Sequence, residues 1–427
     1  MNYDWLRPMH VLESSAFIAA RLAGMTLAQY GADVIRVDPI GGGIDYGRLP
    51  VEPGGRSLYW TGLNKGKRSI AVDLRRPEGR ELVQALAVSA GENGGLLLTN
   101  LAFDWLSHAA LAARRPDMIT CTICGNADGS TAVDYTVNCA TGFPAITGGG
   151  TIDAPINNVV PAWDLACAYQ AAFALLAAFD RRRRSGKGAE LRLALSDVAF
   201  AALSHLGMIA EAELLEEERP SLGNHVYGTF GRDFATADAR RIMIVGISAG
   251  QWKALLRAAR LDAQMGLLQS RLGLDFMREA DRYQAREEIA AIIAGWCAAH
   301  RLADIARLFD EHRVCWGLYR TVRDLVAHDP RVAVPDAPAQ SLFELIDTPG
   351  VGRHRAAGTP VRAAAQVRGA TRPAPLLGQH TDEVLEGVLG LDCAAVGRLH
   401  DAGIVAGPER DPSIPRTASQ SASHGRS

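Results

Sequence analysis

The feature of this sequence that most constrains its fold is an alternation of strand and helix patterns through the first half of the chain. Short apolar runs, bounded by glycine or charged residues, alternate with longer segments in which apolar residues recur every three or four positions. Because two parallel strands need a long crossover, usually a helix, this alternation predicts an α/β fold with a parallel sheet flanked by helices. Strands are predicted at residues 10–12, 32–37, 69–74, 95–99, 118–124 and 191–195, and helices at 17–30, 77–90, 163–180 and 197–213.

The pattern changes after an acidic run at residues 216–218. Short strands and helices are mixed between residues 227 and 330, which predicts a second, smaller domain. Residues 330–371 are rich in proline, glycine and alanine and are predicted to be loop-rich. The last residues, 411–427, contain serine, arginine and proline without apolar periodicity, so we predict a disordered tail there.

Composition and charge exclude several classes of protein. With 48% hydrophobic residues among 427, the chain is long enough to bury a large core. The formal net charge of −2 argues against a protein that coats nucleic acid or an anionic membrane, so neither is an expected partner. We predict no transmembrane helix, because no stretch of about 18 apolar residues is free of charges, and the N-terminus does not resemble a signal peptide.

The cysteines indicate a reducing environment. There are seven, an odd number, and they are scattered along the chain, which argues against a disulfide scaffold and for a cytoplasmic location. Cys121 and Cys124 form a lone CxxC pair inside an apolar run. No second pair or histidine cluster completes a zinc site, so we predict buried structural cysteines and no metal.

Two loops are candidates for binding a phosphorylated ligand. The glycine cluster at residues 41–43 follows a predicted strand, as in a phosphate-binding turn. No helix begins directly after it, so a plain flexible loop fits equally well. The basic loop at residues 64–68 (Asn-Lys-Gly-Lys-Arg) offers three cations to a phosphate, but on these residues alone a solvated surface loop is favoured.

Asp164 is the most informative carboxylate in the sequence. It lies at the predicted start of the long helix, after the run Val-Val-Pro-Ala-Trp at residues 159–163. An acid there stabilises a helix through its dipole by about 0.3–1 kcal/mol, and the same position is expected to keep the carboxylate ionised with a low pKa. An ionised carboxylate on a rigid helix start also suits covalent nucleophilic catalysis. Both interpretations remain open on these residues alone.

The sequence resembles the family III coenzyme A (CoA) transferases, the CaiB/BaiF type, from about residue 9 to residue 405. Four stretches carry the resemblance, and their order and spacing make it far more specific than any one of them. They are residues 31–39 (GADVIRVDP), residues 64–70 (NKGKRSI), Asp164 with the helix after it, and residues 373–385 (PAPLLGQHTDEVL).

The resemblance implies a fold and an assembly. Members have a large Rossmann-like domain made from both chain ends and a smaller α+β domain inserted in the middle, and two subunits interlock as a homodimer. For this chain we therefore expect a second copy as partner and a large CoA-binding domain from residues 1–220 and 331–410. The small domain is expected at residues 221–330.

The resemblance also implies a chemistry. The aspartate, here Asp164, attacks the thioester of an acyl-CoA substrate, releases CoA as a thiolate and forms a mixed anhydride. The thiolate then returns to either carbonyl of the anhydride. No metal or redox cofactor takes part, because CoA is itself part of the substrate.

Matching positions imply which residues bind CoA. A nucleotide-like ligand such as CoA suits the edge of a Rossmann-like sheet. CoA is expected to lie along Phe17, Ile18 and Ala19. Contacts with its polar groups are implied for four more residues: Arg36, Lys67, Arg68 and Asn100. The basic loop is then a ligand-binding loop rather than a solvated one.

Two departures from members of this family narrow the expected reaction. Members that racemise their substrates have a histidine directly before an aspartate, where this chain has Val133 before Asp134, and valine cannot transfer a proton. Members that accept a second acid close a glycine-rich loop on it, whereas the nearest segment here, residues 246–250 (GISAG), has two glycines. The chain is therefore not expected to racemise its substrate, and a separate acceptor acid is disfavoured.

Three more stretches resemble members of this family that move CoA within one molecule, namely residues 134–138, 204–211 and 227–234. Those members transfer CoA between the C1 and C4 carboxyls of 2-methylfumarate (mesaconate) in the 3-hydroxypropionate cycle of carbon fixation. Both carboxylates then arrive on one substrate, so proximity replaces a second binding event. Candidates for binding the free carboxylate are Tyr135, Tyr227 and Arg232, while His205 is favoured as a core residue.

Two other functions remain open on the sequence. One is CoA transfer between two separate carboxylic acids. The other is a non-catalytic protein that binds CoA or a nucleotide, and the presence of Asp164 argues against it.

Overall fold

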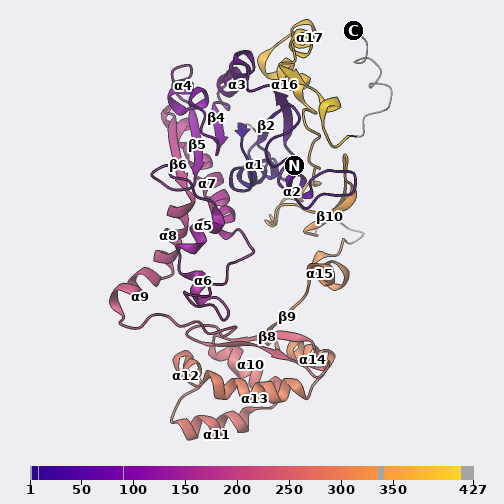
Figure 1. Ribbon diagram of the computed structural model, residues 1–427. Helices are drawn as coiled ribbons and strands as arrows, with labels where there is room; N and C mark the ends of the chain where they lie inside the picture. Colours follow the sequence, from indigo (N-terminus) through magenta and orange to yellow (C-terminus); the bar gives the residue numbers. More distant parts are fainter. Residues whose placement is uncertain (1, 8, 90, 335–340, 415–427) are drawn as a thin grey trace. The chain divides into compact units, whose positions relative to one another are not determined.

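The computed structural model of this chain describes residues 2–7, 9–89, 91–334 and 341–414 (Figure 1). Contacts within the chain divide it into two compact units. The first unit contains both chain ends. Residues 142–158 and 211–220 were predicted to belong to the large domain, whereas contacts in the structure group them with the second unit. The first unit is Met1–Thr141, Val159–Ala210 and Pro330–Ser427, and the second is Gly142–Asn158 and Glu211–Asp329.

A seven-stranded sheet forms the centre of the first unit. Its strand order is β12-β3-β2-β1-β4-β5-β6, and every neighbouring pair is parallel except β12 with β3. Every strand predicted from the apolar runs lies in this sheet, which confirms a mixed α/β architecture with a large parallel sheet. The strands are β1 (His10–Ser14), β2 (Asp33–Pro39), β3 (Arg68–Val72), β4 (Leu96–Thr99), β5 (Ile119–Cys124), β6 (Ala189–Ala194) and β12 (Val405–Ala406).

The helices of the first unit connect and cover these strands. They are α1 (Ala19–Gln29), α2 (Leu58–Leu63), α3 (Pro77–Ser89), α4 (His108–Ala112), α5 (Asp134–Cys139), α7 (Ala162–Ser185), α8 (Leu195–His205), α16 (Thr381–Leu389) and α17 (Cys393–Asp401). Short 3₁₀ turns lie at Asp104–Leu106, Pro330–Val332 and Pro408–Arg410. The helix α9 (Met208–Leu214) runs across the boundary between the two units.

Helices cover both faces of the sheet, as the alternation of side chains along its strands requires. On one face α1 packs against α7, and α7 also contacts β5 and β6. On the other face, Ile35 of β2 belongs to a core cluster that includes side chains of α3, α16 and α17. Val34, the neighbour of Ile35, points the opposite way and lies next to Gly24 of α1. The fold therefore has three layers around two buried sheet faces.

The second unit contains a three-stranded antiparallel sheet and a set of helices. The sheet consists of β7 (Phe230–Ala235), β8 (Arg241–Gly246) and β9 (Cys315–Leu318). Its core includes the fully buried side chains of Phe230, Ile244 and Trp252. The helices are α6 (Phe143–Ile146), α10 (Ala249–Ala259), α11 (Asp262–Leu272), α12 (Glu279–Gln284), α13 (Arg286–Ala298), α14 (Leu302–His312) and α15 (Val322–His328).

The C-terminal segment returns to the first unit and completes its sheet. A hairpin of β10 (Phe343–Thr348) and β11 (Gly352–Ala357) precedes α16 and α17, and β12 then pairs with β3. Asp411 is buried and accepts hydrogen bonds from the Tyr46 hydroxyl and the Leu377 N–H. Residues 411–414 are thus part of the folded unit, contrary to the predicted tail, and residues 415–427 lie outside the described residues.

The helix α7 is long and apolar enough to cross a membrane by length and composition, although the sequence predicted no such helix. The bent pairs α8 with α9 and α13 with α14 would also qualify if each pair formed one span. In this structure α7 is the crossover between β5 and β6, and Cys167, Ala171 and Leu175 on its inner side are buried. Packing on the sheet and on α1 accounts for the apolar character of that side.

Candidate active site

A cavity of about 820 Å³ lies in the first unit, at the carboxyl ends of the parallel strands. Its walls include segments that directly follow β1, β4, β5 and β6. The strand order reverses between β1 and β4, and ligands of open parallel sheets bind outside the strand ends at such a switch point. Six residues predicted from the sequence as site residues line it: Phe17, Ile18, Ala19, Asn100, Tyr135 and Asp164.

The loop between β1 and α1 is fixed from two sides where it lines the cavity. The side chain of Asn100 accepts a hydrogen bond from the Ala16 N–H and donates one to the Ala16 carbonyl oxygen, both at 2.8 Å. Phe17 has a φ of 60°, which is unusual for a residue with a side chain, and its N–H donates to Asp45 Oδ2 at 2.6 Å. Asp45 is itself buried and paired with Arg21. The cavity wall is therefore pre-formed rather than assembled on ligand binding.

Asp164 lies in the first turn of α7, as predicted, but another carboxylate occupies the end of that helix. Asp134 Oδ2 accepts hydrogen bonds from the backbone N–H groups of Trp163, at 2.7 Å, and Asp164, at 2.9 Å. These are N–H groups that a helix leaves without internal partners. Asp134 thus receives the favourable interaction with the helix dipole that the sequence assigned to Asp164, and the Asp164 side chain is left to face the cavity.

The electrostatics of Asp164 differ from the sequence-based expectation of a low pKa. Burial and, to a smaller extent, the negative charge of Asp134 together raise the pKa of Asp164 to about 6, against the opposing positive charge of Arg48. The expectation was wrong because it considered the helix end alone and neglected the second carboxylate and the loss of water. A carboxylate with this pKa is still mostly ionised at neutral pH, and it is more basic than an ordinary aspartate.

The activity is expected to fall as the pH drops through about 6, because only the ionised form of Asp164 can act as a nucleophile. A profile of kcat/KM against pH measures this decrease on the acid side, the acid limb, in the free enzyme. In an Asp134→Asn variant the limb should move to lower pH, since the repelling charge is gone while an amide oxygen can still accept the two N–H groups. An acid limb near pH 4 in the wild type, or one that Asp134→Asn leaves in place, would contradict this assignment.

Several cavity residues were not found from the sequence. Arg48 and Tyr59 follow β2, Cys124 ends β5, and Asp134 begins α5. The guanidinium of Arg48 lies over the rings of Phe17, at 5.5 Å, and Tyr59, at 5.3 Å. The glycine cluster at residues 41–43 was the available signal for the Arg48 loop, since it showed that the chain turns at the carboxyl end of a strand.

Arg36 and Lys67, for which the resemblance implies contacts with CoA, do not line the cavity. Both are buried in a charged network beneath α1 that joins β1, β2 and the residue before β3. Glu13 Oε1 accepts a hydrogen bond from Arg36 Nη1 at 2.6 Å, and Glu13 Oε2 lies 2.8 Å from Lys67 Nζ. Arg36 also pairs with Asp38. Burial lowers the pKa of Lys67 to about 7, and Glu13 opposes this shift.

Arg68 is also engaged within the protein. Its Nε donates to Asp33 Oδ1 at 2.9 Å, and its Nη1 donates to Glu383 Oε1 at 3.2 Å. About a fifth of its side chain is exposed, and it does not line the cavity. Of the residues expected to contact the polar groups of CoA, Asn100 is therefore the one that reaches this cavity.

The other candidates for the acyl group lie in different places. Tyr135 lines the cavity, as does Val133, the residue that the resemblance matches with the racemase histidine. Tyr227 and Arg232 belong to the second unit, where the Tyr227 ring lies 4.0 Å from the guanidinium carbon of Arg219 and Arg232 pairs with Glu287. His205, favoured as a core residue, is instead exposed at the end of α8.

Metal-binding groups do not gather in the part of the chain that the structure describes. No cluster of three or more histidine, cysteine or acidic side chains there could hold a metal ion. All seven cysteines are free thiols. Cys121 is buried as predicted, whereas Cys124 reaches the wall of the cavity. Burial raises the pKa of the Cys124 thiol, so it is a poor nucleophile.

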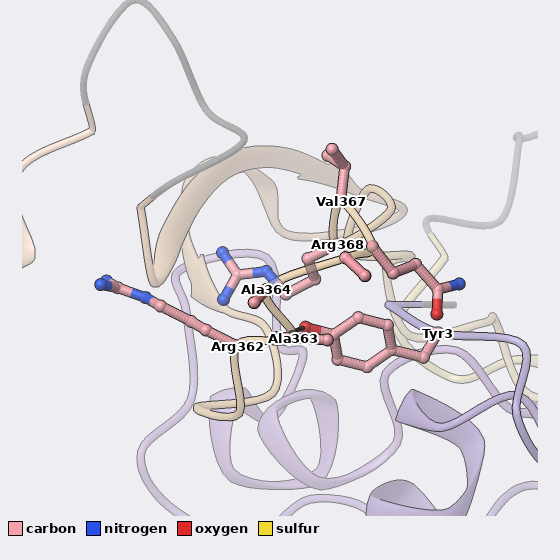
Figure 2. A pocket seen from close by; sticks show the side chains of 8 residues that line it. Tyr3, Arg362, Ala363, Ala364, Val367 and Arg368 are labelled. Atoms are coloured by element: carbon pink, nitrogen blue, oxygen red, sulfur yellow. Dashed lines mark hydrogen bonds between the residues drawn. The ribbon is translucent and has the colours of Figure 1, made fainter.

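A smaller cavity of about 370 Å³ lies beside the N-terminal segment of the same unit (Figure 2). The Tyr3 hydroxyl donates to the Val361 carbonyl oxygen and accepts from the Ala363 N–H, which ties the N-terminus to this loop. Figure 2 shows Arg362 and Arg368 among the side chains that line it. None of the eight described residues that line it carries a carboxylate, so it lacks the nucleophile present in the larger cavity.

Comparison with known families agrees with this geometry. The model of CoA-transferase family III matches residues 6–381, and the chain belongs to this family and is an enzyme of this class. It is 50% identical to 2-methylfumaryl-CoA isomerase of Chloroflexus aurantiacus, over 95% of this chain and 98% of that relative. It is 28% identical to succinyl-CoA–D-citramalate CoA-transferase of the same organism, over 90% of this chain and 94% of that relative.

Solved structures show the same fold. A CaiB/BaiF family protein from Brucella suis matches with a TM-score of 0.71 and 22% identity, over 91% of this chain and all of that one. Rv3272 from M. tuberculosis matches with a TM-score of 0.68 and 22% identity, over 87% of this chain and 97% of that one. At this level of identity the likeness concerns the mixed α/β fold with its large parallel sheet.

Proposed function

We propose that this enzyme moves CoA between the two carboxyl groups of 2-methylfumarate, converting mesaconyl-C1-CoA into mesaconyl-C4-CoA. The observation that carries the proposal is the 50% identity to 2-methylfumaryl-CoA isomerase over nearly the whole chain. The cavity supports it, because one carboxylate with a raised pKa, Asp164, faces a space large enough for an acyl thioester. Val133 supplies no proton-transfer group, which disfavours racemisation.

The proposed mechanism begins with attack of the Asp164 carboxylate on the thioester carbonyl. The C–S bond breaks, CoA leaves as a thiolate, and a mixed anhydride joins the substrate to Asp164. The thiolate then attacks the aspartyl carbonyl, which frees the diacid and leaves CoA as a thioester on Asp164. The second carboxylate of the diacid attacks this thioester, which releases the thiolate and forms a second mixed anhydride. The thiolate then attacks the acyl carbonyl of that anhydride, which gives the C4 thioester and regenerates Asp164.

This mechanism assigns roles to the remaining cavity residues. The loop that contains Phe17, Ile18 and Ala19, which is held by a hydrogen bond from the Ala16 N–H to Asn100, is proposed to run along CoA. The thioester is already activated and CoA is part of the substrate, so the mechanism calls for no metal or redox cofactor.

We also infer that the chain works as a homodimer, interlocked as the family resemblance implies. Aromatic side chains of α7 and α8 are exposed in the single chain, including Tyr169, Phe173 and Phe200. Exposed apolar side chains that gather on one surface mark interaction sites. A second copy of the chain is the proposed partner for this surface.

Incubation with mesaconyl-C1-CoA alone tests the proposed function. Liquid chromatography with mass spectrometry should show the C4 isomer without any added acid, and its rate should not change when succinate or D-citramalate is added. The Asp164→Asn variant is the control for catalysis by this site. A strict requirement for a second acid would show transfer between molecules instead, and no turnover of any acyl-CoA would leave a binding protein.

A further inference from the structure

Arg48 is the one cation among the described residues that line the cavity of Asp164. The anions there are Asp134 and Asp164 itself, and much of the remaining wall is apolar or aromatic. Arg48 is close enough to Asp164 for its charge to lower the pKa of that carboxyl. A second negative group that enters this cavity would therefore find its favourable partner at Arg48.

The guanidinium of Arg48 lies over two aromatic rings, and among the described residues no acceptor is hydrogen-bonded to its N–H groups. Its central carbon lies 5.5 Å from the centre of the Phe17 ring and 5.3 Å from that of Tyr59, within the range of cation–π attraction. In the described parts of the chain, no carboxylate pairs with Arg48, in contrast to Arg21 and Arg36, which pair with buried acids. The N–H groups of Arg48 are thus free to bind a ligand.

The loop that carries Arg48 is anchored to the same structures as the rest of the cavity wall. Asp45, at its start, binds both the Phe17 N–H and the Arg21 side chain. The Ser57 hydroxyl donates to the carbonyl oxygen of Arg48 itself, at 2.5 Å. Buried and half-buried contacts therefore anchor the backbone of the Arg48 loop to the segment of Phe17 before any ligand binds.

We propose that Arg48 binds the carboxylate of the diacid that is not reacting at Asp164, and that it retains the diacid in the cavity while its two ends exchange places. This inference rests on the proposed function. In the proposed mechanism the diacid is bonded to neither Asp164 nor CoA at the middle step, and it then carries two negative charges. A carboxylate without a partner is poorly tolerated in a cavity of low polarity, whereas an arginine binds it through two parallel N–H groups.

The consequence is a preference for substrates with a second carboxylate. Tiglyl-CoA has a methyl group where mesaconyl-C1-CoA has its free carboxylate, so it can acylate Asp164 but cannot bind Arg48. The wild type should acylate Asp164 faster with mesaconyl-C1-CoA than with tiglyl-CoA, by roughly 10- to 100-fold, the range of one charge-assisted interaction. Trapping the acylated Asp164 with hydroxylamine, followed by peptide mass spectrometry, measures both rates.

An Arg48→Gln variant should lose this preference by slowing only the reaction with mesaconyl-C1-CoA. Arg48→Lys keeps the charge without the planar pair of donors and should be intermediate. Arg184→Gln is the matched control, because Arg184 is an exposed arginine at the far end of α7 from Asp164. Equal slowing of both substrates by Arg48→Gln would overturn the assignment, since that result indicates general damage to the site.

Retention is tested with free ¹³C-labelled mesaconate added to unlabelled mesaconyl-C1-CoA. The wild type should form unlabelled C4 isomer, whereas Arg48→Gln should release mesaconate and incorporate the label. Wild-type product that carries label at the rate of turnover, or an Arg48→Gln product without label, would overturn retention by Arg48. Absence of any C4 isomer from the wild type would instead overturn the proposed function, and this inference with it.

Discussion

Replacing Asp164 with alanine or asparagine is expected to lower kcat by roughly 10⁴-fold or more, as when a covalent nucleophile is deleted. In the proposed mechanism every step forms or breaks a bond to this carboxylate, and Asp134 is the other carboxylate among the described residues that line its cavity. Asp134 cannot substitute for it, because its Oδ2 is bonded to two backbone N–H groups of α7. The rate of C4-isomer formation from mesaconyl-C1-CoA measures the loss.

Asp197→Asn is the matched control for this variant. Asp197 is also an acid in the first turn of a helix of the same unit, α8, but it is exposed and does not line the cavity. It should retain the wild-type rate and still give the hydroxamate at Asp164 with hydroxylamine. Near-wild-type turnover by Asp164→Ala would rule out the anhydride mechanism, whatever the control shows.

The Asp164→Asn variant should also be more stable than the wild type at about pH 7–8, which separates loss of catalysis from loss of folding. The pKa of Asp164 is about 6 in the folded chain and near 3.8 in a model peptide. The folded state therefore binds more protons between these values, and stability falls as the pH rises through them. The ionised carboxylate lowers the free energy of unfolding by at most about 3 kcal/mol, and near pH 4 the two proteins should unfold at the same temperature.

The strands of the large sheet were predictable because both of its faces are covered by helices. Such strands are nearly continuous apolar runs, and the run at residues 118–124 became Ile119–Cys124. Helix ends were less predictable. The prediction ended the long helix at residue 180, whereas α7 continues to Ser185, since the arginines at 181–184 are good helix formers and suit its C-terminal end.

The position of Asp164 was predictable from the sequence, but its chemistry was not. A local pattern shows an acid at a helix start, and the dipole argument then gives a low pKa. The groups that reverse this, Asp134 and the surrounding apolar wall, come from other segments that only the fold brings together. The same limit explains Arg48, because the glycine cluster at residues 41–43 indicates a turn but does not single out Arg48, whose neighbours Phe17 and Tyr59 lie in separate segments.

The basic loop shows another limit of a local pattern, because the fold supplies a protein partner for Lys67 that the sequence did not indicate. Three cations in four residues are compatible with phosphate binding, with a solvated surface, or with buried pairs. Lys67 and Glu13 are far apart in the sequence, and Lys67 immediately precedes β3, while Glu13 lies on β1 with β2 between them. Only the order of the strands determines that the two charges meet.

Replacing Lys67 with alanine is therefore expected to reduce stability rather than substrate affinity. Lys67 Nζ donates to Glu13, to Asn64 Oδ1 and to the carbonyl oxygen of Arg21, and it is fully buried. Its removal leaves Glu13 with a weakened set of partners in the core. Breaking a buried ion pair lowers the free energy of unfolding by roughly 3–5 kcal/mol. Unfolding by denaturant, followed by circular dichroism, measures the change.

Lys65→Ala is the control, because Lys65 lies in the same loop and donates to one backbone oxygen, that of Ala357. A single bond of this kind contributes about 1 kcal/mol, so this variant should lose much less stability than Lys67→Ala. The fraction of Lys67→Ala that remains folded should retain the KM of the wild type for mesaconyl-C1-CoA. A raised KM with unchanged stability would restore Lys67 to a CoA-binding role, and it would mean that the network around Glu13 opens when CoA binds.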